Sequence, residues 1–231
     1  MRIDVHNQCP DFNGYRAARV KSLFNAERGN EFKASFDIPV DEDDWKIGLV
    51  VGPSGSGKTS IGRKILGPDA LTDLYGGWPV DTPIVEAIAP DGDFNAVTGA
   101  LASVGLGDVP SWLRPFHALS NGQQFRAGLA RAVCQADGDI VIDEFTSVVD
   151  RQIAKIGAQA FAKAWRRSGG GRVVLLACHY DIIEWLQPDW VLDTASGEVK
   201  KKPRSGQGQT SNLTFSRSTP VTGSTLSSIT T

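Results

Sequence analysis

The sequence predicts an α/β fold built on a largely parallel sheet, and three observations lead to it. Continuous apolar runs at residues 46–51, 139–142 and 172–178 are typical of strands that are buried on both faces. Segments with helical apolar spacing lie between these runs, most clearly at residues 151–167. A Gly-rich loop follows the first run. Strands that alternate with helices in this way usually pair in parallel.

The N-terminal part of the chain carries weaker signals. Residues 1–18 show no clear period and are expected to form a separate N-terminal segment. Two strands are expected next, at residues 19–24 and 31–38, and the second alternates apolar and polar residues as a half-buried strand does. These strands are expected to form a small β subdomain at the start of the main domain, residues 19–202.

The middle of the chain predicts a helix and then a small helical insert. A helix is expected from Lys58 to about Gly67, where Gly and Pro end it. Residues 69–118 contain many Gly and Pro together with short helical patterns, so a reduced helical subdomain is expected there. A further helix is expected directly after Ser120.

The C-terminal part predicts two closing strands and a tail. The strands are expected at residues 190–193 and 198–201. From Pro203 onward the chain is rich in Ser and Thr and contains no acidic residue. This composition is typical of a disordered tail, so residues 203–231 are expected to form one.

Composition argues against several classes of protein. The chain has 24 basic and 26 acidic residues, a net charge of −2, which gives no support for nucleic-acid binding, although a local basic patch stays open. Cys9, Cys134 and Cys178 are too few and too scattered for a disulfide framework or a zinc site, and indicate reduced thiols in the cytoplasm. No apolar run reaches the roughly 18 residues of a membrane span, and the first residues lack a signal-peptide core. No direct membrane insertion is expected.

The first motif that carries chemistry is Gly52-Pro-Ser-Gly-Ser-Gly-Lys58-Thr59, which matches G-x-x-x-x-G-K-[ST] between a buried strand and a helix. Glycines let backbone N–H groups turn inward around phosphate oxygens, and a helix N-terminus favours an anion. Lys58 is expected to reach the β- and γ-phosphates of a nucleotide, and Thr59 to ligate Mg²⁺. The predicted phosphate-binding residues are Gly52, Ser54, Gly55, Ser56, Gly57, Lys58, Thr59 and Ser60.

The second motif is the pair Asp143-Glu144, which follows the apolar run at residues 139–142. In a parallel α/β sheet the carboxyl ends of the strands adjoin the ligand. Asp143 is therefore the candidate that holds Mg²⁺, directly or through water. Glu144 is the candidate general base or water-positioning group for attack on the γ-phosphate.

The third motif, Leu119-Ser-Asn-Gly-Gln-Gln124, lies directly before a helix. With the other two motifs it gives residues 19–200 a resemblance to ABC-type ATPases, whose signature Leu-Ser-Gly-Gly-Gln differs here only at Asn121. The resemblance implies ATP and Mg²⁺ as cofactors, and it implies that Ser120 and Gly122 bind the γ-phosphate. Without the resemblance, Ser120 is an ordinary helix N-cap that contributes about 1 kcal/mol.

Two further positions match this family. Ser147-Val-Val-Asp150 resembles its D-loop, which places Asp150 at the nucleotide site as well as at the start of a helix. His179 follows the last buried run and resembles the switch histidine that contacts the γ-phosphate. In the family, two domains meet head to tail. Ser120 is therefore expected to act on the ATP of a second copy or of a paralogue.

Two features of the family are weak in this chain. ABC-type ATPases usually carry a Gln between the loop and the signature that contacts Mg²⁺ and the attacking water, and no Gln lies between Thr59 and Asn121. Asp81 is expected to ligate the metal in its place. The aromatic residue that stacks on adenine is expected to be Phe24, whose alternative role is that of a core strand residue.

The spacing of the motifs also bears on the function. Lys58 and Ser120 are 62 residues apart, which is shorter than in transporter ATPases of this family. Residues 78–151 further resemble prokaryotic and phage ABC-type ATPases that occur fused to a predicted acetyltransferase domain, although no such domain follows in this sequence. The expected function is a MgATP-hydrolysing dimer that acts as a soluble switch for a partner protein. The alternatives are the ATP-binding subunit of a membrane transporter and a nucleotide-binding regulator without turnover.

Overall fold

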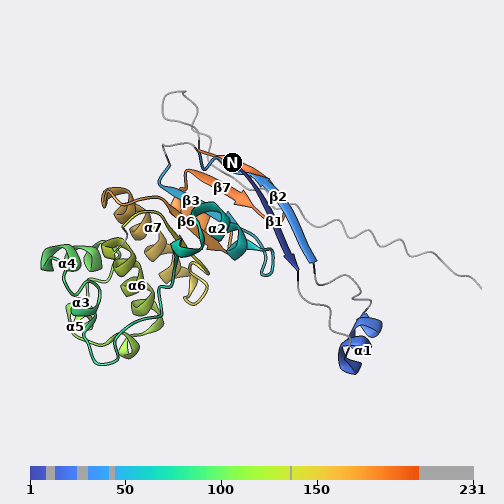
Figure 1. Ribbon diagram of the computed structural model, residues 1–231. Helices are drawn as coiled ribbons and strands as arrows, with labels where there is room; N and C mark the ends of the chain where they lie inside the picture. Colours follow the sequence, from blue (N-terminus) through green and yellow to red (C-terminus); the bar gives the residue numbers. More distant parts are fainter. Residues whose placement is uncertain (9–13, 25–30, 42–44, 136, 203–231) are drawn as a thin grey trace, which may run out of the picture.

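The computed structural model describes residues 1–8, 14–24, 31–41, 45–135 and 137–202. Its centre is a six-stranded sheet in which neighbouring strands pair in parallel, except that the edge strand β8 is antiparallel to β7 (Figure 1). The mixed α/β class with a parallel-dominated sheet is therefore confirmed. In order across the sheet, the strands are β4 (Leu71–Thr72), β5 (Ile140–Ile142), β6 (Val173–Ala177), β3 (Ile47–Val51), β7 (Trp190–Asp193) and β8 (Val199–Lys201).

The buried strands β3 and β6 contribute to two cores, one on each face of the sheet. In β3, Leu49 packs into one core and Val50 into the other, and in β6 Leu175 and Leu176 divide in the same way. Successive side chains of a strand point to opposite faces, and here neither face meets water. This is why the runs are continuously apolar, and it confirms the buried parallel strands expected at 46–51, 139–142 and 172–178.

Helices cover both faces of the sheet. Helix α2 packs on one face, and the apolar sides of α6 and α7 pack on the other, together with the short helix α8. The helices expected at 58–67, after Ser120 and at 151–167 are confirmed, whereas α8 is too short to show a period in the sequence. Their bounds are α2 (Lys58–Leu66), α6 (Asn121–Gln135), α7 (Arg151–Arg167) and α8 (Ile182–Leu186).

The N-terminal residues form a hairpin of β1 (Arg2–Gln8) and β2 (Glu31–Asp37), paired antiparallel. The strand expected at 31–38 is thereby confirmed, while β1 was not expected. Ile3 and Val5 of β1 share a core with α2. The first residues, expected to form a separate segment, are thus packed against the main domain.

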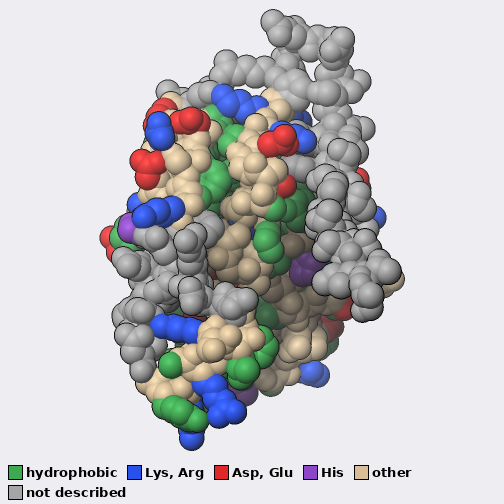
Figure 2. Space-filling view, turned by 90° about the vertical axis from the view of Figure 1, so that its right-hand side faces the viewer, with side chains coloured by type: hydrophobic (Ala, Val, Ile, Leu, Met, Phe, Trp, Pro, Cys, Tyr) green, Lys and Arg blue, Asp and Glu red, His purple; other side chains and the backbone are tan. Residues whose placement is uncertain are grey.

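The strand expected at 19–24 is wrong, because these residues belong to helix α1 (Tyr15–Phe24). Val20, Leu23 and Phe24 follow a spacing of three and four residues, which suits a helix better than a strand. No residue of α1 is buried, and Figure 1 shows α1 beyond the far end of the hairpin. Figure 2 looks onto the side of the molecule that carries α1, and its lower part shows hydrophobic and basic side chains next to one another.

The small helical insert is confirmed between β4 and α6. Trp78 connects the insert to α6: its ring stacks on Phe116 at 4.3 Å between centroids and lies under the guanidinium of Arg131 at 4.1 Å.

No helix of the described residues is long and apolar enough to cross a membrane. The expected tail at 203–231 and Cys9 lie outside the described residues. The elements of the insert are α3 (Ile84–Ala87), α4 (Phe94–Ser103), α5 (Val109–Trp112) and a 3-10 turn (Phe116–Ala118).

Candidate functional site

The Gly-rich loop connects the carboxyl end of β3 to the first turn of α2, as expected. Gly55 and Gly57 have φ angles of 80° and 78°, which L side chains rarely adopt. Only 9% of Lys58 is exposed, and its Nζ donates hydrogen bonds to the carbonyl oxygens of Gly52 at 2.9 Å and Pro53 at 2.7 Å. Because these partners are neutral, the charge of Lys58 is hydrogen-bonded without being neutralised.

The loop meets the second motif through one hydrogen bond. The hydroxyl of Thr59 donates to Oδ2 of Asp143 at 2.6 Å, across 84 positions of sequence. The other oxygen of Asp143, Oδ1, accepts the backbone N–H of Glu144 at 2.8 Å. The two residues expected to hold Mg²⁺ are therefore in contact, at the end of the sheet where α2 begins.

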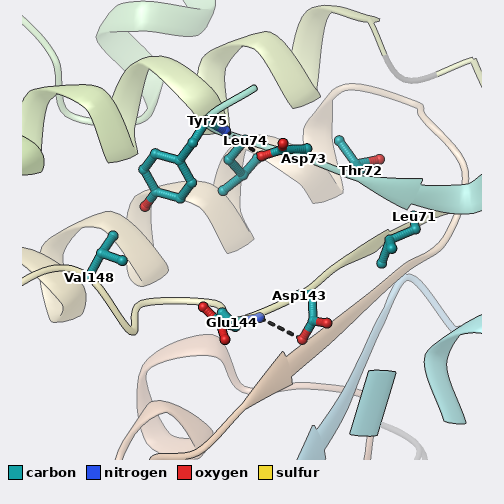
Figure 3. A pocket seen from close by; sticks show the side chains of 8 residues that line it. All are labelled: Leu71, Thr72, Asp73, Leu74, Tyr75, Asp143, Glu144 and Val148. Atoms are coloured by element: carbon teal, nitrogen blue, oxygen red, sulfur yellow. Dashed lines mark hydrogen bonds between the residues drawn. The ribbon is translucent and has the colours of Figure 1, made fainter. Parts of the chain in front are cut away.

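A hollow of about 350 Å³ opens beside this contact (Figure 3). Asp143, Glu144 and Val148 line one side of it, and the segment that follows β4 lines the other, with Asp73 and Tyr75. Glu144 is exposed and has a φ angle of 49°, a left-handed backbone conformation that few residues other than glycine adopt. The turn after β5 thus leaves the carboxylate of Glu144 open to solvent next to Asp143.

Asp73 reaches the hollow and Asp81 does not. Strands β4 and β5 pair with Thr72 opposite Ile142, so the next residues, Asp73 and Asp143, follow at the same end of neighbouring strands. Asp81 lies on an exposed bend before α3 and is not among the residues that line the hollow. Asp73 could not be predicted from the sequence, because the two-residue strand before it is too short to recognise.

The segment that carries Asp73 is held firmly. A guanidinium nitrogen of Arg131 donates to the carbonyl oxygens of Asp73 and Gly76, both at 2.8 Å, and Oδ1 of Asp73 accepts the backbone N–H of Tyr75 at 2.8 Å. Burial, and to a smaller extent the charge of Asp73, raise the pKa of Tyr75 to about 12. The phenol of Tyr75 therefore stays neutral in the hollow at physiological pH.

The signature residues span the start of α6, with Ser120 directly before the helix. Ser120 and Gln123 form a reciprocal cap: the backbone N–H of Ser120 donates to Oε1 of Gln123 at 3.0 Å, and that of Gln123 to the Ser120 hydroxyl at 3.4 Å. Gly122 is buried, and a Cβ there would lie 2.7 Å from the Ile153 side chain of α7. Neither Ser120 nor Gly122 lines the hollow of the same chain.

Of the remaining predicted residues, Asp150 and His179 lie at the same end of the sheet as the phosphate-binding loop, and Phe24 lies away from it. Asp150 caps α7, where one of its oxygens accepts the N–H groups of Gln152 and Ile153, both at 3.0 Å. His179 is exposed two residues after the end of β6, at the same end of the sheet as the loop. Phe24 ends α1 and is 75% exposed, so the structure does not bring it to the phosphate-binding loop.

This fold and site define a P-loop nucleotide-binding domain, since a phosphate-binding loop and an Asp143-Glu144 pair meet at the carboxyl end of a parallel sheet. No family model matches the chain. The cytochrome c biogenesis ATP-binding export protein CcmA of Paracoccus denitrificans is 31% identical over 150 residues, which cover 57% of this chain and 68% of that protein. The chain belongs to the same family, the ABC-type ATPases.

Other relatives support the same family. The Fe(3+) ions import ATP-binding protein FbpC of Pseudomonas fluorescens is 29% identical over 153 residues, which cover 52% of this chain and 43% of that protein. The chain spans about half the length of the curated import proteins it matches. The solved dimeric structure of a bacterial ABC transporter cassette matches with a TM-score of 0.55 and 15% identity, over 76% of this chain and 93% of that one, and shows the same fold.

Proposed function

We propose that this chain binds MgATP and hydrolyses it within an ATP-dependent dimer. The observation that carries the proposal is the hydrogen bond between Thr59 and Asp143, which joins the phosphate-binding loop to the strand that presents Glu144. This contact supports a site in which a phosphate, a metal ion and a general base would meet at one end of the sheet.

The residues present fit Mg²⁺ and a nucleotide. Glycines with positive φ angles shape the loop at the N-terminus of α2, where backbone N–H groups favour an anion. Mg²⁺ prefers one or two protein oxygens together with water and phosphate, and Thr59 and Asp143 supply two such oxygens.

The side chains divide the work of hydrolysis. Lys58 would exchange its bonds to the Gly52 and Pro53 carbonyls for phosphate oxygens. Mg²⁺, when bound, neutralises charge on the phosphates. Glu144 would accept a hydrogen bond from a water in the hollow and orient it, and His179 would contact the γ-phosphate from the end of β6.

A second copy would complete the site. Ser120, Gly122 and Asp150 belong to the predicted nucleotide site, and the head-to-tail pairing that the family resemblance implies would bring them to the phosphate-binding loop of a partner chain. The structure match to a cassette solved as a dimer supports an arrangement in which two chains exchange these residues. We expect Ser120 of each copy to contact the ATP held by Lys58 of the other.

Phosphate release from ATP in the presence of Mg²⁺ tests the proposal. Glu144→Gln should lower the rate by about 100-fold or more, the range expected for the loss of a general base. Glu184→Gln, the same change at an exposed position of α8, should leave the rate unchanged. A wild-type chain that binds ATP without releasing phosphate would instead support a regulator without turnover.

We also propose that ATP binding and hydrolysis serve to switch a partner protein in the cytoplasm through dimerisation of this chain. The short spacing between Lys58 and Ser120, which leaves a small helical insert, supports this choice. The resemblance of residues 78–151 to ATPases fused to an acetyltransferase domain makes a protein with such a domain one partner to test.

The second candidate is the ATP-binding subunit of a membrane transporter. Import ATP-binding proteins among the relatives favour it. Affinity purification of the full chain from its native cells separates the two. An integral membrane protein bound in proportion to the chain would support the transporter, and a stoichiometric partner without a membrane span would support the switch.

A further inference from the structure

The turn between β7 and β8 lies directly against the phosphate-binding loop. Thr194, the first residue after β7, donates its backbone N–H to the carbonyl oxygen of Val51 at 2.8 Å. Its hydroxyl donates to the same oxygen at 3.1 Å and lies 2.6 Å from the hydroxyl of Ser56. Either hydroxyl can be the donor of the shorter bond. The turn therefore holds the loop at both Val51 and Ser56.

Gly52 makes this contact sterically possible. A Cβ at residue 52 would lie 1.9 Å from Oγ1 of Thr194, far inside van der Waals contact. The φ angle of Gly52 is 148°, which is also unsuitable for an L side chain. The absence of a side chain at Gly52 thus leaves room for the hydroxyl of Thr194 beside the phosphate-binding loop.

The same turn also reaches the residue that follows His179. Asp193, of which 6% is exposed, precedes Thr194 and accepts the phenol proton of Tyr180 at 2.8 Å and the backbone N–H of Ala195 at 2.9 Å. Burial and the hydrogen bond to Asp193 raise the pKa of Tyr180 to about 12, so the phenol remains a donor. The segment with His179 and the phosphate-binding loop are consequently attached to neighbouring residues, the last of β7 and the first of the turn that follows it.

We infer that the β7–β8 turn is a clamp in which Thr194 positions the phosphate-binding loop through Ser56 and Asp193 positions His179 through Tyr180. The inference rests on the proposed ATP binding. Neither Thr194 nor Tyr180 is expected to touch the nucleotide; they act through Ser56 and His179. Thr194 and Tyr180 are positioning residues with separable roles. Thr194 supports the part of the loop that ADP and ATP share, and Tyr180 supports the group expected at the γ-phosphate.

Nucleotide binding by the full chain, measured by calorimetry with Mg²⁺, tests the clamp. Thr194→Val removes the hydroxyl at nearly constant volume, and with it the bonds to Ser56 and Val51, so it should weaken ADP and ATP alike by about tenfold. Thr194→Ser restores the hydroxyl and should bind close to wild type. Tyr180→Phe should leave ADP binding unchanged and lower the rate of phosphate release. Thr98→Val, the same change on α4, is the matched control and should alter neither.

A double-mutant cycle keeps the test valid if one variant folds poorly. Ser56→Ala removes the same bond from the side of the loop and should also weaken both nucleotides. Combined with Thr194→Val it should add little to the loss caused by Thr194→Val alone, because that variant has already lost the contact with Ser56. Fully additive losses would overturn the clamp.

The outcomes also separate the clamp from the proposed function. If the wild type does not bind ATP, or if Lys58→Ala binds it equally well, then the proposed function fails. If the wild type binds, Lys58→Ala does not, and Thr194→Val and Ser56→Ala both bind ADP as the wild type does, then the clamp alone is wrong.

Discussion

The two ends of the central sheet use charged side chains in opposite ways. At the amino end, Asp139 accepts hydrogen bonds from the backbone N–H and the guanidinium of Arg172, at 2.5 to 2.9 Å, and Asp189 accepts two backbone N–H groups at 2.8 and 2.9 Å. At the carboxyl end, Lys58 has carbonyl partners and Glu144 faces a hollow. Charges at the amino end have partners within the protein, whereas those at the carboxyl end can exchange neutral partners for a ligand.

This difference separates stability from binding. The guanidinium of Arg172 also lies over the ring of Trp45 at 5.0 Å and donates to the carbonyl oxygen of Val40 at 3.1 Å, so it joins three segments. Substitutions there should change the free energy of unfolding and leave nucleotide affinity alone. Substitutions at the carboxyl end should do the reverse.

The largest expected effect is at Lys58. Lys58→Ala should lower ATP affinity by about 100-fold, because hydrogen bonds between a charged donor and the phosphates are lost. The melting temperature without nucleotide should change little, since the bonds that are lost in the free protein go to backbone carbonyls. Calorimetric titration and a thermal melt of the same sample measure both quantities. A large fall in melting temperature with unchanged ATP affinity would show that Lys58 serves stability rather than binding, contrary to the role expected for the carboxyl end of the sheet.

A smaller effect on turnover should distinguish Asp73 from Asp81. Asp73→Asn keeps an oxygen for the N–H of Tyr75 but removes a negative charge from the hollow, and it should lower phosphate release by about tenfold. Asp81→Asn is the matched change on an exposed bend and should have no effect. If Asp81→Asn is the impaired variant, the bend must move to the site when nucleotide binds.

At the amino end, Asp139→Asn should destabilise the protein by about 1 to 2 kcal/mol at pH 7, through loss of the ion pair and its charge-assisted hydrogen bonds. Urea unfolding measures the difference, and ATP affinity should stay at the wild-type value. A change in affinity without a change in stability would show that the two ends do not divide the work in this way.

The pH dependence of the same variant gives the sign of the effect. Burial raises the pKa of Asp139, but hydrogen bonds from Arg172 outweigh burial and hold that pKa below its usual value. A carboxylate with a lowered folded pKa stabilises the protein fully above its unfolded pKa of about 3.9 and loses this contribution as the pH falls through the folded pKa. The stability difference between wild type and Asp139→Asn should therefore shrink below about pH 4.

The smallest effect is expected in α1. Phe24→Ala removes a side chain that is 75% exposed, so both stability and ATP affinity should stay within the error of a surface substitution, about 0.5 kcal/mol. A clear loss of ATP affinity would restore Phe24 as the residue that stacks on adenine, and would require α1 to approach the phosphate-binding loop.

The carboxyl end of the sheet could largely be predicted from the sequence, for a physical reason. The continuous apolar runs of β3 and β5 mark where each buried strand ends; Asp143 directly follows one of them, and the Gly-rich motif that ends at Lys58-Thr59 follows the other. The structure brings Thr59 and Asp143 into contact as that reasoning requires.

Residues on short or solvated elements could not be predicted in this way. Asp73 follows a strand of two residues, and Thr194 contacts Ser56 across 138 positions, so neither leaves a local pattern. Helix α1 has no buried residue, so the strand predicted at 19–24 had no burial pattern to separate it from a helix. Apolar periodicity in a sequence reflects which side chains are buried, and these residues are exposed or only partly buried.

The most direct test of the central claim is the oligomeric state of Glu144→Gln with ATP. Size-exclusion chromatography with MgATP should show a dimer for Glu144→Gln, because ATP is held between two chains and is not cleaved. The same variant without nucleotide, and the double variant Lys58→Ala/Glu144→Gln with MgATP, should both elute as monomers. If Glu144→Gln binds ATP at saturation and still elutes as a monomer, two copies of this chain do not share the ATP, and the claim of an ATP-dependent homodimer is contradicted.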